Sequence, residues 1–382
     1  MKTLFEEFEV LEDPRDVRGK KYKLIDLLIM TIYGILCGLE DYTNIAFFLK
    51  KKEEYFTKLL KLENGIPSHD CLSDIFSVIN SEKFMEIFIQ WTKKIIEQKT
   101  NKIISIDGKA VRAATDKVNS GNIPYIVSAF LGDIGVSIGQ VKVEDKSNEI
   151  TAIPELLDLI DIKDAYITID AIGTQTKIAE KIVEKGGHYA LDVKNNQKNL
   201  YKSIKNYFDS INNLNANKNI FKKIVKDKTN HGRTEKREYY LSYDVKTIKN
   251  EHWSSVNAVA YVRIERTIKD ETCINDKYFI IDTKISIDKL VEVLRDHWNI
   301  ETGLHWKLDV IMGEDKSRNR VKNSINNLSI LRKIVFNLAN LDTSLDKQFG
   351  NKKIPLRRKI TNYMLDFSAI ENLLFNIIPK MQ

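Results

Sequence analysis

Cysteine is scarce in this sequence. The 382 residues include three cysteines, Cys37, Cys71 and Cys273, which lie far apart and never form a CxxC pair. An odd number at this spacing excludes a disulfide framework and a zinc knuckle of the usual kind. We therefore expect a cytoplasmic protein, since the cytosol is a reducing compartment.

Long uncharged apolar runs are missing as well. The most apolar segment, residues 24–39, contains Asp26 and is shorter than the roughly 20 residues that a membrane-spanning helix needs. The N-terminus lacks the charged stretch, apolar run and small-residue cleavage site of a secretory signal. Residues 24–39 are thus predicted to form a buried helix, and no membrane partner is expected.

Charge is abundant but only slightly unbalanced. The chain has 60 Lys and Arg against 53 Asp and Glu, a net charge of +7, and its 43% hydrophobic residues are enough for two or three folded units. Residues 194–249, however, include 14 basic and 5 acidic residues. The excess of positive charge in this one segment is larger than that of the whole chain. A basic face that binds a polyanion is indicated there.

Apolar periodicity divides the chain into regions. Residues 1–100 form a helical N-terminal domain, with helices predicted over 24–39, 42–62, 70–79 and 82–97 and with Ser68 or Asp70 as an N-cap. A βββαβαβ order follows, with strands over 103–106, 123–131, 136–143, 166–169 and 188–193 and a hairpin turn over 132–135. A basic, β-rich insertion is predicted over about 195–286, and helices resume from Asp288. The fold class is α/β, with residues 101–382 as the second, interrupted domain.

Two aspartates follow core strands of this pattern. Asp107 and Asp170 each stand at the carboxyl end of a predicted strand, where a side chain is held rigidly. Either one alone is more often a turn cap. Together they match a site for two divalent cations that acts on phosphodiesters, since neighbouring carboxylates bridge ions about 3.5 to 4 Å apart.

A third acidic ligand is expected near residue 300. His297-Trp-Asn-Ile-Glu301 and His305-Trp-Lys-Leu-Asp309 share one pattern, eight residues apart. On a continuous α-helix that offset means a rise of about 12 Å, so Glu301 and Asp309 cannot both reach one metal pair. The same distance separates His297 from His305 and excludes a zinc site on this face. The residues alone leave the choice between the two acids open.

Seven motifs together resemble the insertion-sequence transposases of the DDE type, in particular the subgroup with the H-repeat-associated proteins. They occur in that family's order over almost the whole chain: Asp13-Pro-Arg15, Ile106-Asp-Gly-Lys109, Lys146-Ser-Asn-Glu-Ile150, Asp170-Ala-Ile-Gly-Thr-Gln175, Lys194-Asn-Asn-Gln197, His231-Gly-Arg-x-Glu-x-Arg237 and His297-Trp-x-Ile-Glu301. The resemblance implies an RNase H-like (retroviral integrase-like) catalytic domain with an inserted segment. It also implies Asp107, Asp170 and Glu301 as catalytic and metal-binding residues for two Mg²⁺ or Mn²⁺ ions.

The partners implied are the terminal inverted repeats of a mobile element and target DNA, bound by at least a homodimer, so the protein is expected on the bacterial nucleoid. The residues expected to contact DNA are Lys194, Gln197, Arg233, Arg237, His297 and Lys307. Around Glu301 the wider group has a tyrosine, an arginine and a lysine where this chain has Leu294, His297 and Leu308, and its subgroup commonly has asparagine in place of Thr302.

Two other functions are compatible with the pattern. A DNA-binding remnant or repressor would keep the fold without the reaction, although all three acids are present here. A nuclease that acts on RNA in hybrids would leave the helical domain and the basic insertion unexplained, and it ranks last.

Overall fold

The computed structural model describes residues 4–16, 18, 20–97, 99–114, 123–143, 149–211, 214, 217–229, 233–248, 251–269 and 271–377. Two compact units account for the chain: unit 1 comprises Met1–Lys99, Gly108–Ala152 and Glu301–Gln382, and unit 2 comprises Thr100–Asp107 and Ile153–Ile300. Each unit is described by itself. Of the helices described, none is long and apolar enough to cross a bilayer.

Unit 1 is mainly helical. Its helices are α1 (Leu4–Phe8), α2 (Leu24–Leu36), α3 (Tyr42–Lys51), α4 (Glu53–Leu60), α5 (His69–Val78), α6 (Ser81–Ile96), α11 (Trp306–Val310), α12 (Ser324–Leu341), α13 (Ser344–Gln348), α14 (Leu356–Leu365) and α15 (Phe367–Glu371). The four helices predicted in the first 100 residues are confirmed, except that 42–62 is broken at Lys52, and Ser68 is the N-cap of α5. A second break, at Asp366, divides the predicted helix over 359–378 into α14, α15 and a π-helical turn over Asn372–Ile377.

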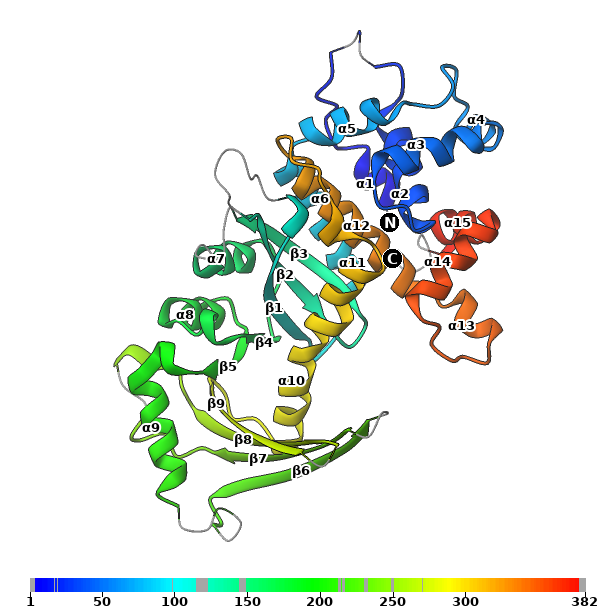
Figure 1. Ribbon diagram of the computed structural model, residues 1–382. Helices are drawn as coiled ribbons and strands as arrows, with labels where there is room; N and C mark the ends of the chain where they lie inside the picture. The colour runs from blue at the N-terminus through cyan, green and yellow to red at the C-terminus, as the bar shows by residue number, and fades with distance from the viewer. Residues whose placement is uncertain are drawn as a thin grey trace. The chain divides into compact units, whose positions relative to one another are not determined.

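Helix α12 forms the centre of unit 1. It contacts α2, α5, α6 and α14 as well as strand β3 (Val136–Val143), and Figure 1 shows it among these elements. Nearly all of its residues are buried, because it is covered on every side. Its polar residues are hydrogen-bonded: Asn327 Nδ2 donates to the carbonyl of Phe76 at 2.9 Å, and Asn337 Nδ2 donates to that of Ser137 at 2.7 Å.

Strand β1 (Ile103–Ala110) belongs to both units, since their boundary falls between Asp107 and Gly108. On the unit 1 side the strand order is β3-β2-β1, where β2 (Tyr125–Leu131) and β3 form the predicted antiparallel hairpin. Its turn ends at Gly135, whose φ of +71° is left-handed and favours glycine. Helix α7 (Glu149–Leu159) also crosses the unit boundary, at Ala152.

In unit 2 the strand order is β1-β4-β5-β9-β8-β7-β6. Strands β4 (Tyr166–Ile169) and β5 (His188–Val193) run parallel to β1, whereas β9 (Glu271–Ile281), β8 (Ala258–Ile268), β7 (Arg233–Ser242) and β6 (Ile220–Thr229) continue the sheet as antiparallel neighbours. Helix α8 (Thr176–Glu184) joins β4 to β5, and α10 (Ile287–Asn299) follows β9. The predicted strands 166–169 and 188–193 are confirmed at both ends.

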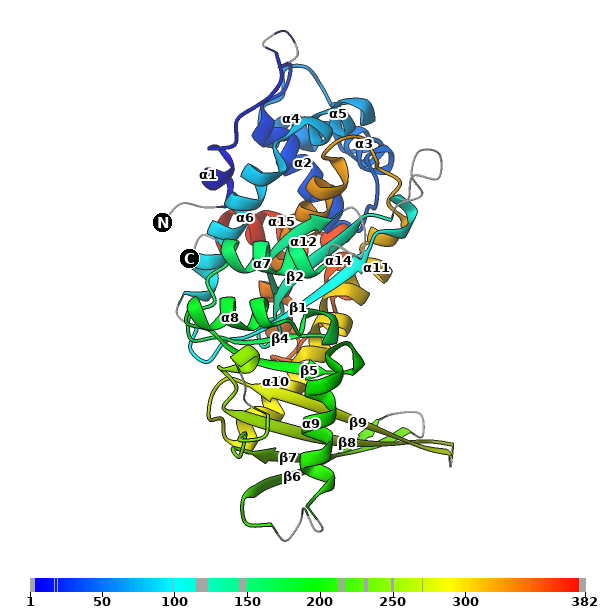
Figure 2. The same cartoon turned by 90° about the vertical axis from the view of Figure 1, so that its left-hand side faces the viewer.

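The insertion contains more than strands. Besides β6, β7, β8 and β9 it includes the helix α9 (Lys198–Asp209), which was not predicted. Helix α9 packs across the strands through rings, with Phe208 against Tyr261 and Tyr201 against Tyr278 (Figure 2). On α10, Leu290, Val291 and Leu294 join a buried core with residues of β7, β8 and β9.

Candidate functional site

The parallel pairing of β1 with β4 brings the two predicted aspartates to the same level of the sheet. The register pairs Ile106 with Ile169, so Asp107, inside β1, and Asp170, directly after β4, are the next residues. Strand β1 continues to Ala110, so the prediction that it ends before Asp107 was wrong. Four residues of β1 and three of β4 are buried and fix this register. Asp170 turns the chain into a short 3₁₀-helix, and its Oδ1 accepts a hydrogen bond from the Ile172 amide at 3.1 Å.

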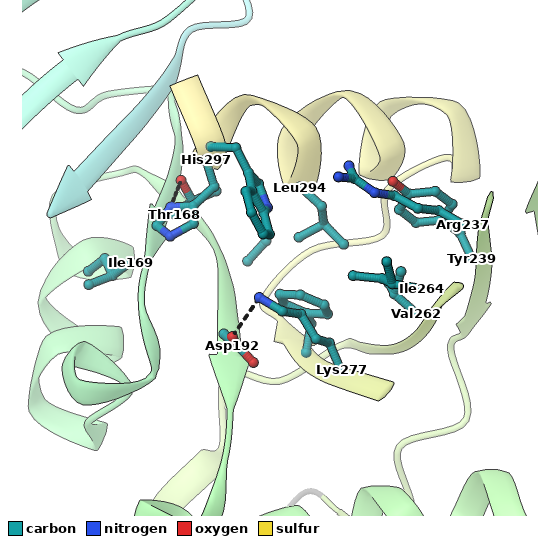
Figure 3. Close-up of a pocket in the computed structure, with 13 residues that line it drawn as sticks. Thr168, Ile169, Asp192, Arg237, Tyr239, Val262, Ile264, Lys277, Leu294 and His297 are labelled. Atoms are coloured by element: carbon teal, nitrogen blue, oxygen red, sulfur yellow. Dashed lines mark hydrogen bonds and ion pairs between the residues drawn. The ribbon is translucent and has the colours of Figure 1, made fainter. Parts of the chain in front are cut away.

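A third aspartate, missed from the sequence, continues this row on the neighbouring strand. Ile169 pairs with Leu191, so that Asp192 of β5 stands at the level of Asp170. Asp192 is 6% exposed, and its Oδ2 lies 3.4 Å from Lys277 Nζ and 3.6 Å from Lys194 Nζ. The sequence signal was the acidic residue near the end of an apolar strand. Figure 3 shows Asp192 and Lys277 facing one another from β5 and β9.

The carboxyl end of α10 is attached to the strands that carry Asp107 and Asp170. His297 Nδ1 lies 3.1 Å from Thr168 Oγ1, which in turn donates to Ser105 Oγ at 3.1 Å (Figure 3). Ser105 Oγ donates to the Asp296 carbonyl at 3.4 Å. His297, expected to contact DNA, is therefore held against β4.

The helix beyond α10 is not the regular α-helix assumed in the sequence argument. Residues Ile300–His305 form a π-helical turn before α11, so the rise and rotation calculated for eight α-helical residues do not apply. Glu301 lies in this turn and is exposed. π-Turns inside helices are frequent at functional sites.

Asp309 has a different environment, which lies wholly within unit 1. Its carboxylate forms an ion pair with Lys109 Nζ, which also donates to Glu314 Oε2 at 2.6 Å. Although burial opposes its charge, these two acids raise the pKa of Lys109. Asp309 is thus engaged by a lysine.

Glu314 connects Lys109 to a fully buried charge network. Its Oε1 accepts from Ser329 Oγ at 2.8 Å, and Lys333 Nζ donates to the same hydroxyl oxygen at 3.1 Å. Burial would raise the pKa of Glu314, yet Lys109, Lys333 and Arg332 hold it far below its ordinary value. Burial also lowers the pKa of Lys333 to about 8.

The residues expected to contact DNA lie in different settings. Lys194 is 59% exposed, whereas Gln197 donates from Nε2 to the Thr174 carbonyl at 2.9 Å, so its amide stabilises the loop after Asp170. Arg237 forms an ion pair with Glu235 and lies over the ring of Trp298. The side chain of Arg233, like His231 and Gly232 of its motif and Lys146 to Asn148 of another, falls outside the described residues.

Lys307 lies in unit 1, over the ring of Phe336 with Nζ 5.6 Å from its centroid. Burial lowers the pKa of Lys307, and the nearby Lys353 and Lys359 lower it further. Since it is half-buried, this lysine is a less available phosphate contact than the exposed Lys194.

Asp107 and Asp170 offer hard oxygen ligands on adjacent strands, of the kind that a divalent cation prefers. Within the part of the chain that the structure describes, no three His, Cys, Asp or Glu side chains gather closely enough to hold a metal ion. These two residues by themselves fit two ligands of a metal site.

Comparison with known proteins identifies the family of this chain. Residues 5–92 match the family model described as DDE_Tnp_1-associated, and residues 98–338 match the model of the transposase DDE domain. The H repeat-associated putative transposase YhhI of Escherichia coli is 34% identical over 98% of both chains, and the putative protein YbfL of the same organism is 33% identical over 98% of both. The putative transposase YncI of Escherichia coli O157:H7 is 34% identical over 88% of this chain and 87% of its own. The chain belongs to the family of transposases with a DDE domain.

Proposed function

We propose that this protein cuts DNA at the ends of an insertion sequence and joins the freed 3′ ends to target DNA, with Asp107, Asp170 and Glu301 as its catalytic carboxylates. The observation that carries the proposal is the register that sets Asp107 and Asp170 at the same level on β1 and directly after β4. An RNase H-like fold is supported by the antiparallel hairpin of β2 and β3 and by the parallel order β1-β4-β5.

Two observations support Glu301 rather than Asp309 as the third acid. Asp309 is already neutralised by Lys109. Ser105, Thr168 and His297 attach the carboxyl end of α10 by hydrogen bonds to β1 and β4, the strands of Asp107 and Asp170. Glu301 follows this end of α10 in the chain and is exposed.

Transposases of this family generally use a divalent metal. Asp107, Asp170 and Glu301 would hold two Mg²⁺ or Mn²⁺ ions, which when bound acidify a water and stabilise the leaving 3′ oxygen. The protein's own part is to keep Asp107 and Asp170 in place. The parallel pairing of β1 and β4 holds these two acids in register, so they need little reorganisation.

Lys194, Gln197, Arg233, Arg237, His297 and Lys307 are proposed as contacts to DNA, with the first 100 residues recognising the terminal repeats. Lys194 suits a phosphate contact because it is exposed beside Asp192. His297 suits one only when protonated, since the same ring contacts Thr168. Gln197 acts by shaping the loop after Asp170.

The test is cleavage of a labelled duplex that carries the element's terminal repeat, with Mg²⁺ or Mn²⁺, by the full chain and by Asp107→Asn, Asp170→Asn, Glu301→Gln and Asp309→Asn. The first three should lose more than about 100-fold in cleavage while still binding the duplex, and Asp309→Asn should keep measurable cleavage. Cleavage that survives Glu301→Gln but not Asp309→Asn overturns the assignment of the third acid. Binding without cleavage by the parent, with either metal, would favour a DNA-binding repressor.

A further inference from the structure

A pocket of unit 2 lies between α10 and the strands β4, β5, β7, β8 and β9 (Figure 3). Two cations lie over one aromatic ring in it. Lys277 Nζ is 5.2 Å from the ring centroid of Trp298, and Arg237 Cζ is 5.5 Å from the same centroid. Such pairs are attractive, and they restrict where the two cations can lie.

Each of these cations is also held by a buried carboxylate. Lys277 donates to Asp192 Oδ2 at 3.4 Å, and Arg237 forms an ion pair with Glu235. The two acids are 6% and 5% exposed. Because a long cationic side chain loses rotamer freedom when it is held from two sides, Lys277 and Arg237 are already ordered for a ligand.

Positive charge exceeds negative charge in this group. Two further cations contact the same acids: Lys194 Nζ lies 3.6 Å from Asp192, and Arg266 Nε donates to Glu235 at 3.0 Å. Four cations therefore share two carboxylates, and an excess of two positive charges remains. Partly buried charges are screened less than exposed ones, so an anion is attracted to the pocket.

One hydrogen-bond donor at this position has no acceptor in the described part of the chain. Arg237 Nε is buried and unpaired, although the same guanidinium pairs with Glu235 through another nitrogen. A buried donor without an acceptor costs about 1 to 3 kcal/mol. A ligand oxygen that accepts a hydrogen bond from Arg237 Nε would remove this cost. Among the same charged side chains, Asp192 Oδ1 is buried and lacks a hydrogen-bond donor.

We propose that this pocket binds one phosphodiester group of a DNA strand. The neighbouring phosphodiester of the same strand is the one that is cut beside Asp170. Lys277 and Arg237 are the contacts, and Asp192 and Glu235 are the carboxylates that position them. The proposal rests on the function proposed above. It follows from the register, because Asp192 stands level with Asp170 on the adjacent strand, about 4.8 Å away.

A phosphate is favoured over a nucleobase as the group bound here. The ring of Trp298 already contacts two cations, whereas the unpaired donor and the excess charge both require an anionic acceptor. Lys277, in the middle of β9, was not among the residues that the sequence indicated.

The test measures binding of the terminal-repeat duplex by the full chain over a range of salt concentrations. Losing one phosphate contact lowers the slope of log K against log salt by about 0.9. We expect that loss for Lys277→Gln, an unchanged slope for Lys277→Arg, and an unchanged slope for Lys205→Gln, whose lysine forms an exposed pair with Asp209 on α9.

A second arm tests the positioning role. Asp192→Asn should slow cleavage in the parent background but add little to Lys277→Gln, since each change disables the same contact. If the parent protein binds and cuts the duplex and Lys277→Gln has the same salt slope and the same cleavage rate, the proposed phosphate site is wrong and the proposed function is unaffected. A parent that neither binds nor cuts the duplex refutes the proposed function instead. Slopes lowered equally by Lys277→Gln and Lys205→Gln would show general attraction and overturn the specific site.

Discussion

At the scale of single residues, two pairs of acids in this protein have different surroundings. Asp107 and Asp170 lie level with each other on neighbouring strands and are partly exposed. Asp309 and Glu314 are instead bound to Lys109. The second pair therefore belongs to an ion-pair network that stabilises unit 1.

Glu314 makes stability sensitive to acid. The pKa of Glu314 in the folded protein lies far below the ordinary value of 4.5. Its contribution to the free energy of unfolding is therefore complete above pH 4.5. This contribution is lost as the pH falls from 4.5 toward the pKa of the folded state. The unfolding free energy should drop across this range by up to about 1.4 kcal/mol per pH unit from this group. Urea unfolding between pH 3 and 6 measures it.

The matched variants for this measurement are Glu314→Gln and Glu86→Gln. Glu314→Gln removes the titrating group, so its free energy of unfolding should depend less on pH between pH 3 and 6. Its stability at pH 7 should also fall, because the buried Lys333 loses a partner. The second changes an exposed pair with Lys83 and should keep the parent's slope. The same slope in all three proteins would contradict the role given to Glu314.

Site residues could be read from the sequence only where chain position alone decides their place. Asp107 and Asp170 follow short apolar strands, and adjacent parallel strands bring their ends together. Asp192 is different, because its partner Lys277 is 85 residues away along the chain. The two residues of the ion pair Lys109–Asp309 lie even farther apart in sequence, so local patterns do not reveal it.

At the scale of elements, a row of stacked tyrosines organises the insertion. Tyr240, Tyr261 and Tyr278 are directly opposite one another on β7, β8 and β9, with ring centroids 5.5 and 5.3 Å apart. Phe208 of α9 covers the middle ring. Cross-strand aromatic pairs of this kind stabilise a sheet and fix its register.

Replacing the central ring should therefore loosen the insertion. Tyr261 is 8% exposed, and Tyr261→Ala should cost about 3 kcal/mol because it leaves a cavity beneath α9. Hydrogen exchange of β7 to β9 and thermal unfolding measure the loss. Phe221→Ala on β6 is the control, since Phe221 is 44% exposed and should cost less than about 1 kcal/mol. Equal losses would mean that the stacked row has no special role.

The same elements show why parts of the fold escaped the sequence. Strands 166–169 and 188–193 were found because continuous apolar runs between polar turns indicate buried strands. Helix α9 buries Leu200, Ile204 and Phe208 within a polar, lysine-rich segment, and most of the described side chains of β6 are at least partly exposed. Neither segment has the continuous apolar run that indicated β4 and β5. The π-turn at Ile300 has no local signal, because a regular α-helix would suit the same residues.

At the scale of the whole molecule, the proposed function, with one proposed catalytic centre in each chain, predicts assembly on DNA. Two element ends have to be cut and joined, so we expect two chains and two end duplexes in the active complex. Sedimentation of the Asp107→Asn variant with the terminal-repeat duplex gives this stoichiometry without cleavage. A random duplex of the same length should yield no defined complex. A single chain that holds two ends would refute the prediction.

Unit 1 is assembled from three separate stretches of chain, and its central helix α12 comes from the last of them. During translation, Leu24 to Ile96 leave the ribosome long before Ser324 does, at about 5 to 20 residues per second. For some tens of seconds the early helices lack the partner that Asn327 provides at Phe76 and Ile79. The nascent N-terminal part therefore has its surface for α12 uncovered until synthesis has nearly finished, and unit 1 can be completed only then.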